Sequence, residues 1–574
     1  MNHRISLCLA ACAALAACGQ KAGEPAAPET AEVRSPVAVE AAGGNPAAEV
    51  ATRQITDEYM REILREISRD EYEGRGPGTR GDEKARQYLV GRMQELGLEP
   101  GAEDGGWEQN FDLVGLNTDQ PKNWTFEGDD TSLTLRQWDQ YMINSDVQEP
   151  HAEVNDAEVV FVGYGIQAPE YDWDDYKGAD LDGKIALIMN NDPDWDPELF
   201  AGEARLWYGR WDYKYQKAAD MGAVGAIIIH TTPSASYPFQ VIQTSNVGIQ
   251  FELPAGDKRR KQFDAWMTED AVKELVSMAG FDLDELRERA YNRDFEPVPL
   301  GVTTSIAMDV EVTRVQSANV LGLIPGSDPV LRDEVVIYSA HHDHLGIGPP
   351  NEEGDTIYNG AFDNASGVAL VMGIARAFKA LPESPRRAVL FARVGAEEQG
   401  LLGSLWYARN PTFPAGKIAA NINYDGGNVR GETHDVTYVG LGKSSIDALT
   451  QLIAAEQGRE VLPDQFPTKG SFYRSDQFSF ARIGVPAAYL DPGVNYVDRP
   501  EGWGKEQDAY YTEAHYHQPS DEYDPSWDLS GVVEDAILGY WVGLAIANAN
   551  EMPKWNEGDE FEAVRQEALA DAAE

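Results

Sequence analysis

Short apolar runs alternate with segments of helical periodicity through the second half of the chain. Residues 335–338 and, apart from Arg393, 388–394 are apolar, contain β-branched and aromatic side chains, and are bounded by polar or glycine positions, which is typical of buried strands. An apolar helical pattern opens at Gly367. This alternation continues to about residue 550. It predicts an α/β fold with a mostly parallel mixed sheet and helices on both faces.

The same pattern divides the chain into further segments. Residues 53–115 open with two charged helical stretches and are predicted to be the first part of the domain that continues at 300–550. Residues 116–299 contain several short β runs and are predicted to be a β-rich insert, with a helical cap at 256–299. Residues 551–574 form an acidic tail.

The N-terminal region has the composition of an export signal. After Arg4, residues 1–17 are rich in Ala and Leu but too short to span a membrane, which predicts a secretory signal peptide. The residues around Cys18 resemble a bacterial lipobox, which implies a lipidated Cys18 after cleavage; an ordinary signal peptide is the alternative. Residues 18–52 are rich in Ala, Pro, Glu and Gly and are predicted to be a disordered tether. We therefore expect a lipid-anchored protein of the bacterial cell envelope that faces the periplasm or the cell surface. Gln20 and Lys21, without an Asp, favour the outer membrane by analogy with enteric sorting.

Composition excludes several classes of function. The 574 residues carry a formal net charge of -49, which argues against binding nucleic acid or anionic lipid through charge. Only three cysteines are present, Cys8, Cys12 and Cys18, and cleavage before Cys18 would remove two of them. A cysteine nucleophile or a cysteine-ligated metal is therefore not expected. No Gly-x-Ser-x-Gly or His-Glu-x-x-His motif occurs, so a serine hydrolase of the α/β type and a zincin are not expected either.

A set of histidines and carboxylates follows the predicted strands, where open α/β sheets build their sites. These residues, in chain order, are His341, Asp363, Glu398, Asp425 and His517. Two imidazoles and three carboxylates can hold two zinc-like ions if one carboxylate bridges them. Glu397 then remains to move protons.

The local contexts of these residues resemble the M28 family of co-catalytic zinc peptidases, which includes bacterial leucyl aminopeptidases and glutamate carboxypeptidases. The resemblance is carried by His-His-Asp-His-Leu-Gly at 341–346, Ala-Glu-Glu-Gln-Gly-Leu-Leu-Gly-Ser at 396–404 and His-Gln-Pro-Ser-Asp at 517–521. It implies two zinc ions bridged by Asp363. It also implies the remaining ligands, which are His341 and Asp425 for one ion and Glu398 and His517 for the other.

The resemblance implies roles for residues that are not ligands. Glu397 matches the general base, and Asp343 matches the carboxylate that orients the His341 ring. A cis peptide bond is implied between Asp363 and Asn364. His342 and His344 are interpreted as residues of the wall or of the shell behind the ligands.

The substrate pocket is where the resemblance is weakest. A family tyrosine that holds the oxyanion aligns near Phe472, so Tyr473 is the candidate, and Arg474 begins Arg-Ser-Asp-Gln where the family has Arg-Ser-Asp-His. The insert resembles a protease-associated (PA) domain through its β runs at 159–165 and 184–189 and its helix, turn and strand at 218–229.

Three functions stay open at this point. The resemblance implies a zinc exopeptidase acting on peptides, with an aminopeptidase as the first hypothesis. A glutamate carboxypeptidase-like enzyme is the alternative, because amine and carboxylate pockets come from loops that the sequence does not place. A non-catalytic binding protein is the third possibility, and the complete ligand set argues against it.

Overall fold

The computed structural model describes residues 46–196, 199–256 and 258–573. The predicted signal peptide, Cys18 and most of the predicted tether lie outside these residues. The tether was predicted to extend to residue 52, and this boundary is wrong. Helix α2 (Pro46–Thr52) already belongs to the folded part, because its Ala48 and Ala51 are buried in the main apolar core.

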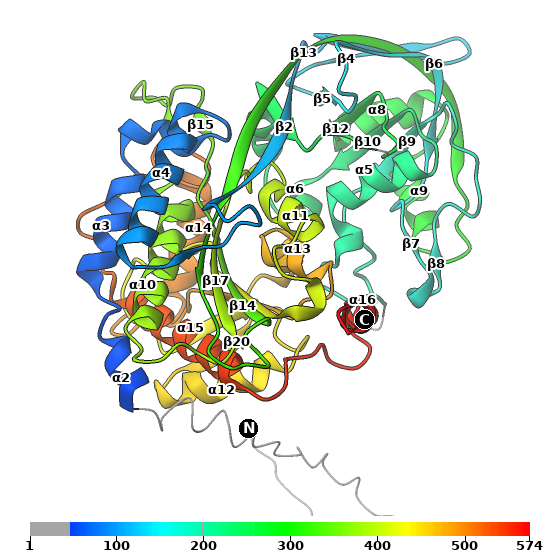
Figure 1. Ribbon diagram of the computed structural model, residues 1–574. Helices are drawn as coiled ribbons and strands as arrows, with labels where there is room; N and C mark the ends of the chain where they lie inside the picture. Colours follow the sequence, from blue (N-terminus) through cyan, green and yellow to red (C-terminus); the bar gives the residue numbers. More distant parts are fainter. Residues whose placement is uncertain (1–45, 197–198, 257, 574) are drawn as a thin grey trace, which may run out of the picture. The chain divides into compact units, whose positions relative to one another are not determined.

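A mixed sheet forms the centre of the fold, and its middle strands are parallel (Figure 1). Its order is β20–β19–β21–β18–β14–β17–β13, with β17, β14, β18 and β21 running in one direction. Every residue of β14, β17 and β18 is buried, as expected for parallel strands covered on both faces. The strands are β13 (Val298–Ile324), β14 (Val335–His341), β17 (Ala388–Val394), β18 (Ile418–Asn423), β19 (Asp435–Val439), β20 (Glu460–Pro463) and β21 (Ala487–Asp491).

Helices cover the two faces because side chains alternate along each strand. Val336 and Tyr338 of β14 point into a large apolar core, whereas Val335 and Ile337 point into a second core on the other face. The helices of the first face are α3 (Asp57–Ile67), α4 (Arg80–Glu95), α10 (Gly367–Lys379), α12 (Ile446–Glu456) and α15 (Ser530–Asn548). The second face is covered by α11 (Leu402–Arg409) and α13 (Gln477–Ala481). The predicted α/β fold class is confirmed.

Helix α15 is the one described helix that is long and apolar enough to cross a membrane by length and composition. Its apolar window is 78% buried inside the protein. It packs against α10 and the central sheet, and the hydroxyl of Tyr338 donates to the carbonyl of Gly539 within it at 2.7 Å. We therefore interpret α15 as a core helix of the α/β domain.

The insert has a sheet of its own, in the order β4–β3–β13–β6–β9–β10–β12–β5. Its strands besides β13 are β3 (Asn123–Glu127), β4 (Ser132–Arg136), β5 (Tyr141–Ser145), β6 (His151–Phe161), β9 (Ile185–Met189), β10 (Gly225–His230) and β12 (Phe263–Thr268). Helices α5 (Trp211–Asp220), α8 (Glu269–Met278) and α9 (Leu283–Ala290) pack on it.

The predicted helical cap at 256–299 needs correction. It contains β12, which lies between β10 and β5 inside the insert sheet. Alternate residues of this strand, Phe263, Ala265 and Met267, are fully buried, which is the period of a strand rather than of a helix. Helices α8 and α9 form the rest of the segment.

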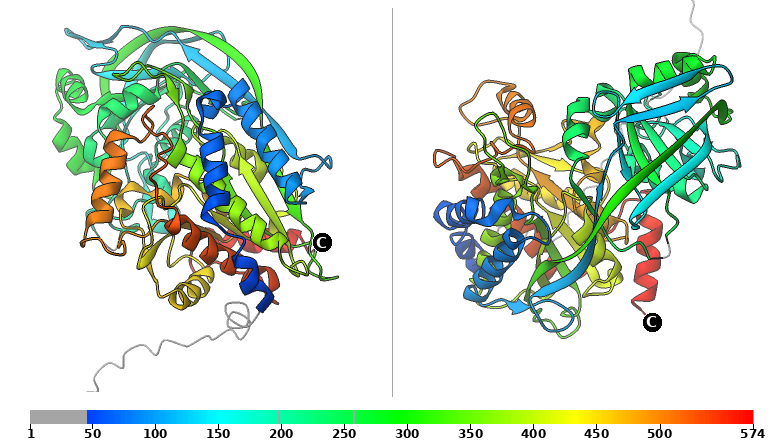
Figure 2. Two further views of the ribbon diagram at one scale, coloured as in Figure 1. Left: turned by 90° about the vertical axis from the view of Figure 1, so that its left-hand side faces the viewer. Right: turned by 90° about the horizontal axis from the view of Figure 1, so that it is seen from above.

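Strand β13 has 27 residues and belongs to both sheets (Figure 2, right). Its first half pairs with β3 and β6 of the insert, and its second half pairs with β2 (Glu108–Thr118) and β17 of the central sheet. The predicted domain border at 299/300 therefore falls inside one continuous strand. In the tail, α16 (Glu562–Asp571) buries Arg565, whose guanidinium donates to the carbonyl of Ala415 at 3.0 Å.

Candidate active site

The candidate ligands meet at the carboxyl ends of the parallel strands. His341 is the last residue of β14, and Asp425 lies just beyond the end of β18. Glu398 lies in the loop after β17, and Asp363 lies in the turn that opens α10. His517 comes from the loop after α14 (Trp503–Ala514). Because these strands run in one direction, their ends share one edge of the sheet, and the ligands from distant parts of the chain converge there.

Asp363 lies between the two histidines, with one carboxylate oxygen facing each. Its Oδ1 is 3.2 Å from Nε2 of His341, and its Oδ2 is 3.6 Å from Nε2 of His517. His341 Nε2 also lies 3.0 Å from Oδ1 of Asp425. His517 Nε2 lies 2.9 Å from Oε2 of Glu398. The five residues therefore form two nitrogen-and-carboxylate pairs with one carboxylate between them, as expected from the sequence.

This donor set fits two zinc ions. Zinc prefers imidazole nitrogen and carboxylate oxygen, and the potential ligand atoms of His341, Asp363 and Asp425 lie within 4.8 Å of one another. The buried Nε2 of His517 is aimed at the carboxylates of Glu398 and Asp363, where an ion would lie. An excess of buried carboxylates also requires positive charge, which the two ions would provide.

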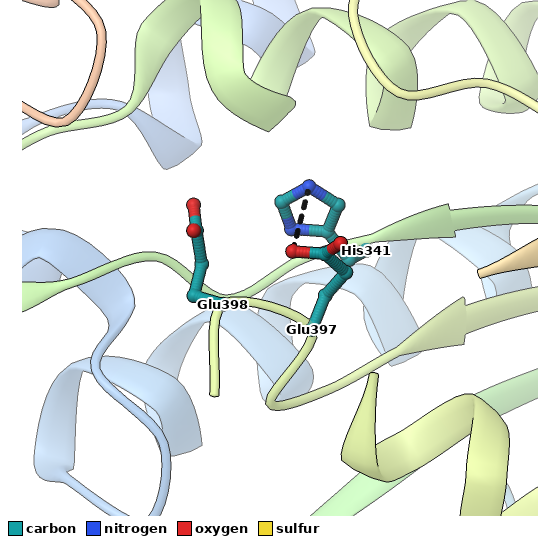
Figure 3. A group of neighbouring side chains, drawn as sticks. All are labelled: His341, Glu397 and Glu398. Carbon is teal, nitrogen blue, oxygen red and sulfur yellow. Dashed lines mark ion pairs between the residues drawn. The ribbon is translucent and has the colours of Figure 1, made fainter. Parts of the chain in front are cut away.

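Glu397 is placed to exchange a proton beside the ligands. Its Oε2 is 3.9 Å from Nε2 of His341, and Figure 3 shows its carboxylate against that ring while Glu398 stands apart. Burial raises the pKa of Glu397 well above its ordinary value, and the Asp425 and Glu398 carboxylates add to the increase against the opposing effect of His341. A carboxylate with a raised pKa is a better proton acceptor, which is the property required of a general base.

Asp343 holds both the histidine and the catalytic loop. Its carboxylate accepts from the backbone N–H of Glu397 at 3.0 Å and of Glu398 at 3.4 Å. Nδ1 of His341 lies 3.3 Å from the backbone oxygen of Asp343 and 3.7 Å from its Oδ1. Burial raises the pKa of Asp343 to about 6. The His341 ring therefore contacts the backbone oxygen of Asp343 more closely than its carboxylate, and the carboxylate fixes the backbone that carries the two glutamates.

His344 contacts a candidate ligand directly. Its Nδ1 lies 2.6 Å from Oε1 of Glu398, and both side chains are buried. The contact leaves Oε2 of Glu398 for His517. His344, Asp363 and Glu398 also form one of the groups of side chains close enough to hold an ion. His342 lies elsewhere, because its Nε2 contacts Oδ1 of Asp82 at 3.1 Å. The sequence placed both histidines behind the ligands but did not indicate the contact with Glu398.

The turn that carries Asp363 is held by a residue that sequence reasoning did not single out. Asp521 accepts from the backbone N–H groups of Phe362 at 2.9 Å and of Asp363 at 3.1 Å. The His-Gln-Pro-Ser-Asp segment therefore links His517 to the turn that carries Asp363. The Asp that ends this motif is the sequence feature from which the role of Asp521 could have been inferred. The peptide bond between Asp363 and Asn364 is cis, as the resemblance implied.

The proposed oxyanion residue Tyr473 needs correction. Its hydroxyl donates to Oε1 of Glu560 at 2.6 Å, and its ring packs against Phe472 and Phe478, away from the ligands. Residues 471–473 form a short 3-10 turn, so neighbouring side chains point in different directions. Tyr516 and Tyr489 lie beside candidate ligands instead: the Tyr516 ring stacks on His517 at 3.8 Å between centroids, and the Tyr489 hydroxyl donates to the backbone oxygen of Asp425 at 3.4 Å. Burial lowers the pKa of Arg474, but the electrostatic effects of Tyr516, Tyr237 and Glu397 outweigh it, so that the pKa is raised.

Comparison with known proteins finds similarity to peptidases. Peptidase family M28 matches residues 319–541. A 190-residue segment is 28% identical to leupeptin-inactivating enzyme 1 of Streptomyces exfoliatus and covers 32% of this chain and 39% of that protein. A 229-residue segment is 28% identical to aminopeptidase Y of Saccharomyces cerevisiae and covers 39% of this chain and 38% of that protein. This chain therefore matches about two fifths of the length of these two relatives.

Among solved structures, the aminopeptidase from Aneurinibacillus sp. strain AM-1 is similar, with a TM-score of 0.49 and 19% sequence identity. That comparison covers 89% of this chain and 97% of the other. All the candidate ligands lie inside the segment matched by the family, in the order His341, Asp363, Glu398, Asp425 and His517. Residues 319–541 of this chain form a domain of peptidase family M28.

Proposed function

We propose that this protein is a zinc-dependent exopeptidase and that it acts as an aminopeptidase, releasing N-terminal residues from peptides. The observation that carries the proposal is Asp363, which faces His341 with one oxygen and His517 with the other, next to Glu397. The M28 domain and the aminopeptidases among its relatives support the same activity.

In the proposed site, His341 and Asp425 would hold one zinc ion, Glu398 and His517 would hold the other, and Asp363 would serve both. The ions, when bound, supply Lewis-acid polarisation and a water of lowered pKa. Glu397 accepts the proton of the attacking water and delivers it to the leaving amine. Asp343 holds the loop that carries Glu397, so the Glu397 carboxylate is already oriented before the substrate binds. His344 fixes Glu398 on the side facing His517.

The activity can be tested directly. Removing metal with a chelator is expected to abolish hydrolysis, and added zinc is expected to restore it, because both ions take part in the reaction. L-leucine p-nitroanilide should be cleaved, whereas an N-acetylated dipeptide ending in glutamate should not. Cleavage of the acetylated peptide alone would replace the aminopeptidase with a carboxypeptidase. A purified protein without zinc and without activity on either substrate would contradict the proposal.

We further propose that the protein is attached to the bacterial cell envelope through a lipid on Cys18 and that the 116–299 insert is a PA domain. The segment around Cys18 supports the anchor by its similarity to a lipobox. Residues 1–17 hold one basic and no acidic side chain, so the charge of the mature chain would be -49 - 1 = -50. Such a chain is repelled by anionic lipid, so attachment requires a covalent lipid.

Substitution Cys18→Ser is expected to leave the precursor unprocessed at this position or to release the protein from the membrane fraction. Each buried CH₂ of a lipid chain contributes about 0.8 kcal/mol, so attachment by several chains should resist high salt. Fractionation and mass spectrometry of the N-terminus measure both properties. A wild-type protein that is soluble and begins downstream of Cys18 without modification would contradict the anchor.

A further inference from the structure

The loop that carries Glu397 and Glu398 has an unfavourable backbone conformation (Figure 3). Two of its residues other than glycine, Ala396 and Leu401, have left-handed backbone with φ of 56° and 61°. The N–H groups of Gly400 and Leu401 both donate to the carbonyl of Glu397 at 2.8 Å, so a tight turn starts at the proposed general base. Left-handed backbone is unfavourable for residues other than glycine and persists only where surrounding contacts hold it. The position of Glu397 therefore depends on contacts from outside the loop.

Some of these contacts come from the M28 domain itself. The side chain of Asn319 accepts from the N–H of Gly395 at 3.1 Å and donates to the carbonyl of Gly403 at 2.8 Å, which fixes the two ends of the loop. The carboxylate of Asp343 accepts from the N–H groups of the two glutamates. The residue that follows the glutamates is not held by either of these side chains.

The contact to that residue comes from the insert. Strand β11 (Ile249–Glu252) belongs to the 116–299 segment but pairs with β2 of the central sheet. Gln399 reaches this strand, and its Oε1 accepts from the backbone N–H of Phe251 at 3.1 Å. The Gln399 side chain is partly exposed. The catalytic loop is therefore tied to the main chain of the insert two residues after Glu397.

Apolar side chains of the same segment pack against the loop. Leu253, directly after β11, is 6% exposed and shares an apolar cluster with Ala396 and Leu402 of the loop. Phe251 packs against this cluster. A Cβ at Gly115 of β2 would lie 2.8 Å from Cε1 of Phe251, so the glycine makes room for the ring. The hydrogen bond of Gln399 is therefore part of a packed contact and not an isolated surface interaction.

Strand β11 is itself fixed to the rest of the insert. The side chain of Gln148 donates to Oε1 of Glu252 at 2.8 Å. The guanidinium of Arg260 pairs with Glu252 and also lies 3.0 Å from Oδ1 of Asp146, which directly follows β5. A continuous series of contacts therefore runs from the insert sheet through β11 to Gln399.

We propose that Gln399 is a positioning residue, which holds Glu397 in place by anchoring the catalytic loop to β11 of the insert. This inference rests on the proposed exopeptidase function and adds a residue to it. A general base must lie within hydrogen-bond reach of the proton that it accepts, and a small displacement lowers turnover. The insert thereby contributes to catalysis through a main-chain N–H group, whatever the substrate.

Three substitutions at Gln399 separate the acceptor oxygen from the shape of the side chain. Gln399→Met keeps the length without the oxygen, Gln399→Asn keeps the amide but is one methylene shorter, and Gln399→Glu keeps both length and acceptor. With L-leucine p-nitroanilide, kcat is expected to fall about 3- to 10-fold in the first two variants, the size expected for one lost hydrogen bond. Gln399→Glu should recover most of this loss. Each kcat is measured at the pH optimum of its variant, so that the added carboxylate does not distort the comparison.

The effect should be confined to turnover. KM, zinc content and the midpoint of thermal unfolding should change little in the Gln399 variants, because this side chain is partly exposed and is not a proposed ligand. Gln250→Met is the matched control, since Gln250 precedes Phe251 and its side chain donates only locally, to the carbonyl of Val247 at 3.0 Å. Equal kcat in all three Gln399 variants, or a raised KM without a change in kcat, would overturn the positioning role.

Amide hydrogen exchange tests the anchor without turnover. Peptides covering residues 249–253 and 396–402 should exchange about 3- to 10-fold faster in Gln399→Met than in the wild type or in Gln399→Glu, because the N–H of Phe251 loses its acceptor. Residues 418–423 of β18 are the internal reference and should not change. If the wild type cleaves no peptide, this result would still support the anchor and contradict only the exopeptidase. Unchanged exchange in both peptides would overturn the anchor.

Discussion

Glu397→Gln is expected to lower kcat by about 100- to 10,000-fold, the usual contribution of a general base. The amide has nearly the same shape as the carboxylate but cannot accept the proton of the attacking water. Zinc content and the affinity for peptides should change little, because Glu397 lies 3.9 Å from His341 and is not one of the proposed ligands. Steady-state kinetics together with metal analysis of the purified variant check both expectations.

The neighbouring residue provides the control. Glu398→Gln should lose zinc first, because Glu398 lies 2.9 Å from His517 and belongs to the ligand set. The carboxylate of Glu398 has its pKa lowered to about 2: burial opposes this decrease, and His517 and His344 produce it, so the group is ionised and ready to bind a cation. A Glu397→Gln variant that folds but loses its zinc, beside a Glu398→Gln variant that keeps it, would show that the two roles are reversed.

Asp363→Ala is expected to remove both zinc ions and all detectable activity. Asp363 is the only one of the five proposed ligands that faces both histidines, so its loss removes an oxygen ligand from each ion. Metal analysis and peptide hydrolysis measure the effect, and circular dichroism checks the fold. Asp333→Ala, at a side chain that is 80% exposed, is the control and should keep both ions. Two zinc ions retained by Asp363→Ala would contradict the bridging assignment.

The proximity of the five candidate ligands could be predicted from the sequence, because His341, Glu398 and Asp425 follow strands, Asp363 opens a helix and His517 lies in a recognisable motif. The apolar runs before His341 and Glu398 became β14 and β17, and parallel pairing of these strands brought the residues together. Asp363 and His517 were identified from the sequence motifs around them. Asp521, which ends the His517 motif, accepts a hydrogen bond from the backbone N–H of Asp363 and so holds its turn. Local pattern and sheet topology therefore determined this part of the site.

Residues whose position depends on contacts between distant loops could not be predicted. The loop that carries Arg205 packs on residues 467–470, a contact that no local pattern indicates. Tyr473 was assigned by its place in a motif, but a 3-10 turn directs its hydroxyl to Glu560. Strand β12 was included in the predicted helical cap because residues 269–293, which follow it, have a charged helical pattern, although alternate residues of the strand are buried.

The long strand β13 has a consequence for movement between the two sheets. At about 3.3 Å per residue its 27 residues span roughly 90 Å, and hydrogen-bonded neighbours flank it along most of that length. A strand paired in this way resists stretching and hinging far more than a flexible linker does. A rotation of one sheet therefore also moves the other, because a continuous paired strand and not a flexible linker connects them. The insert sheet is paired with one half of this strand and the central sheet with the other, so movement of one sheet relative to the other requires bending or twisting of β13.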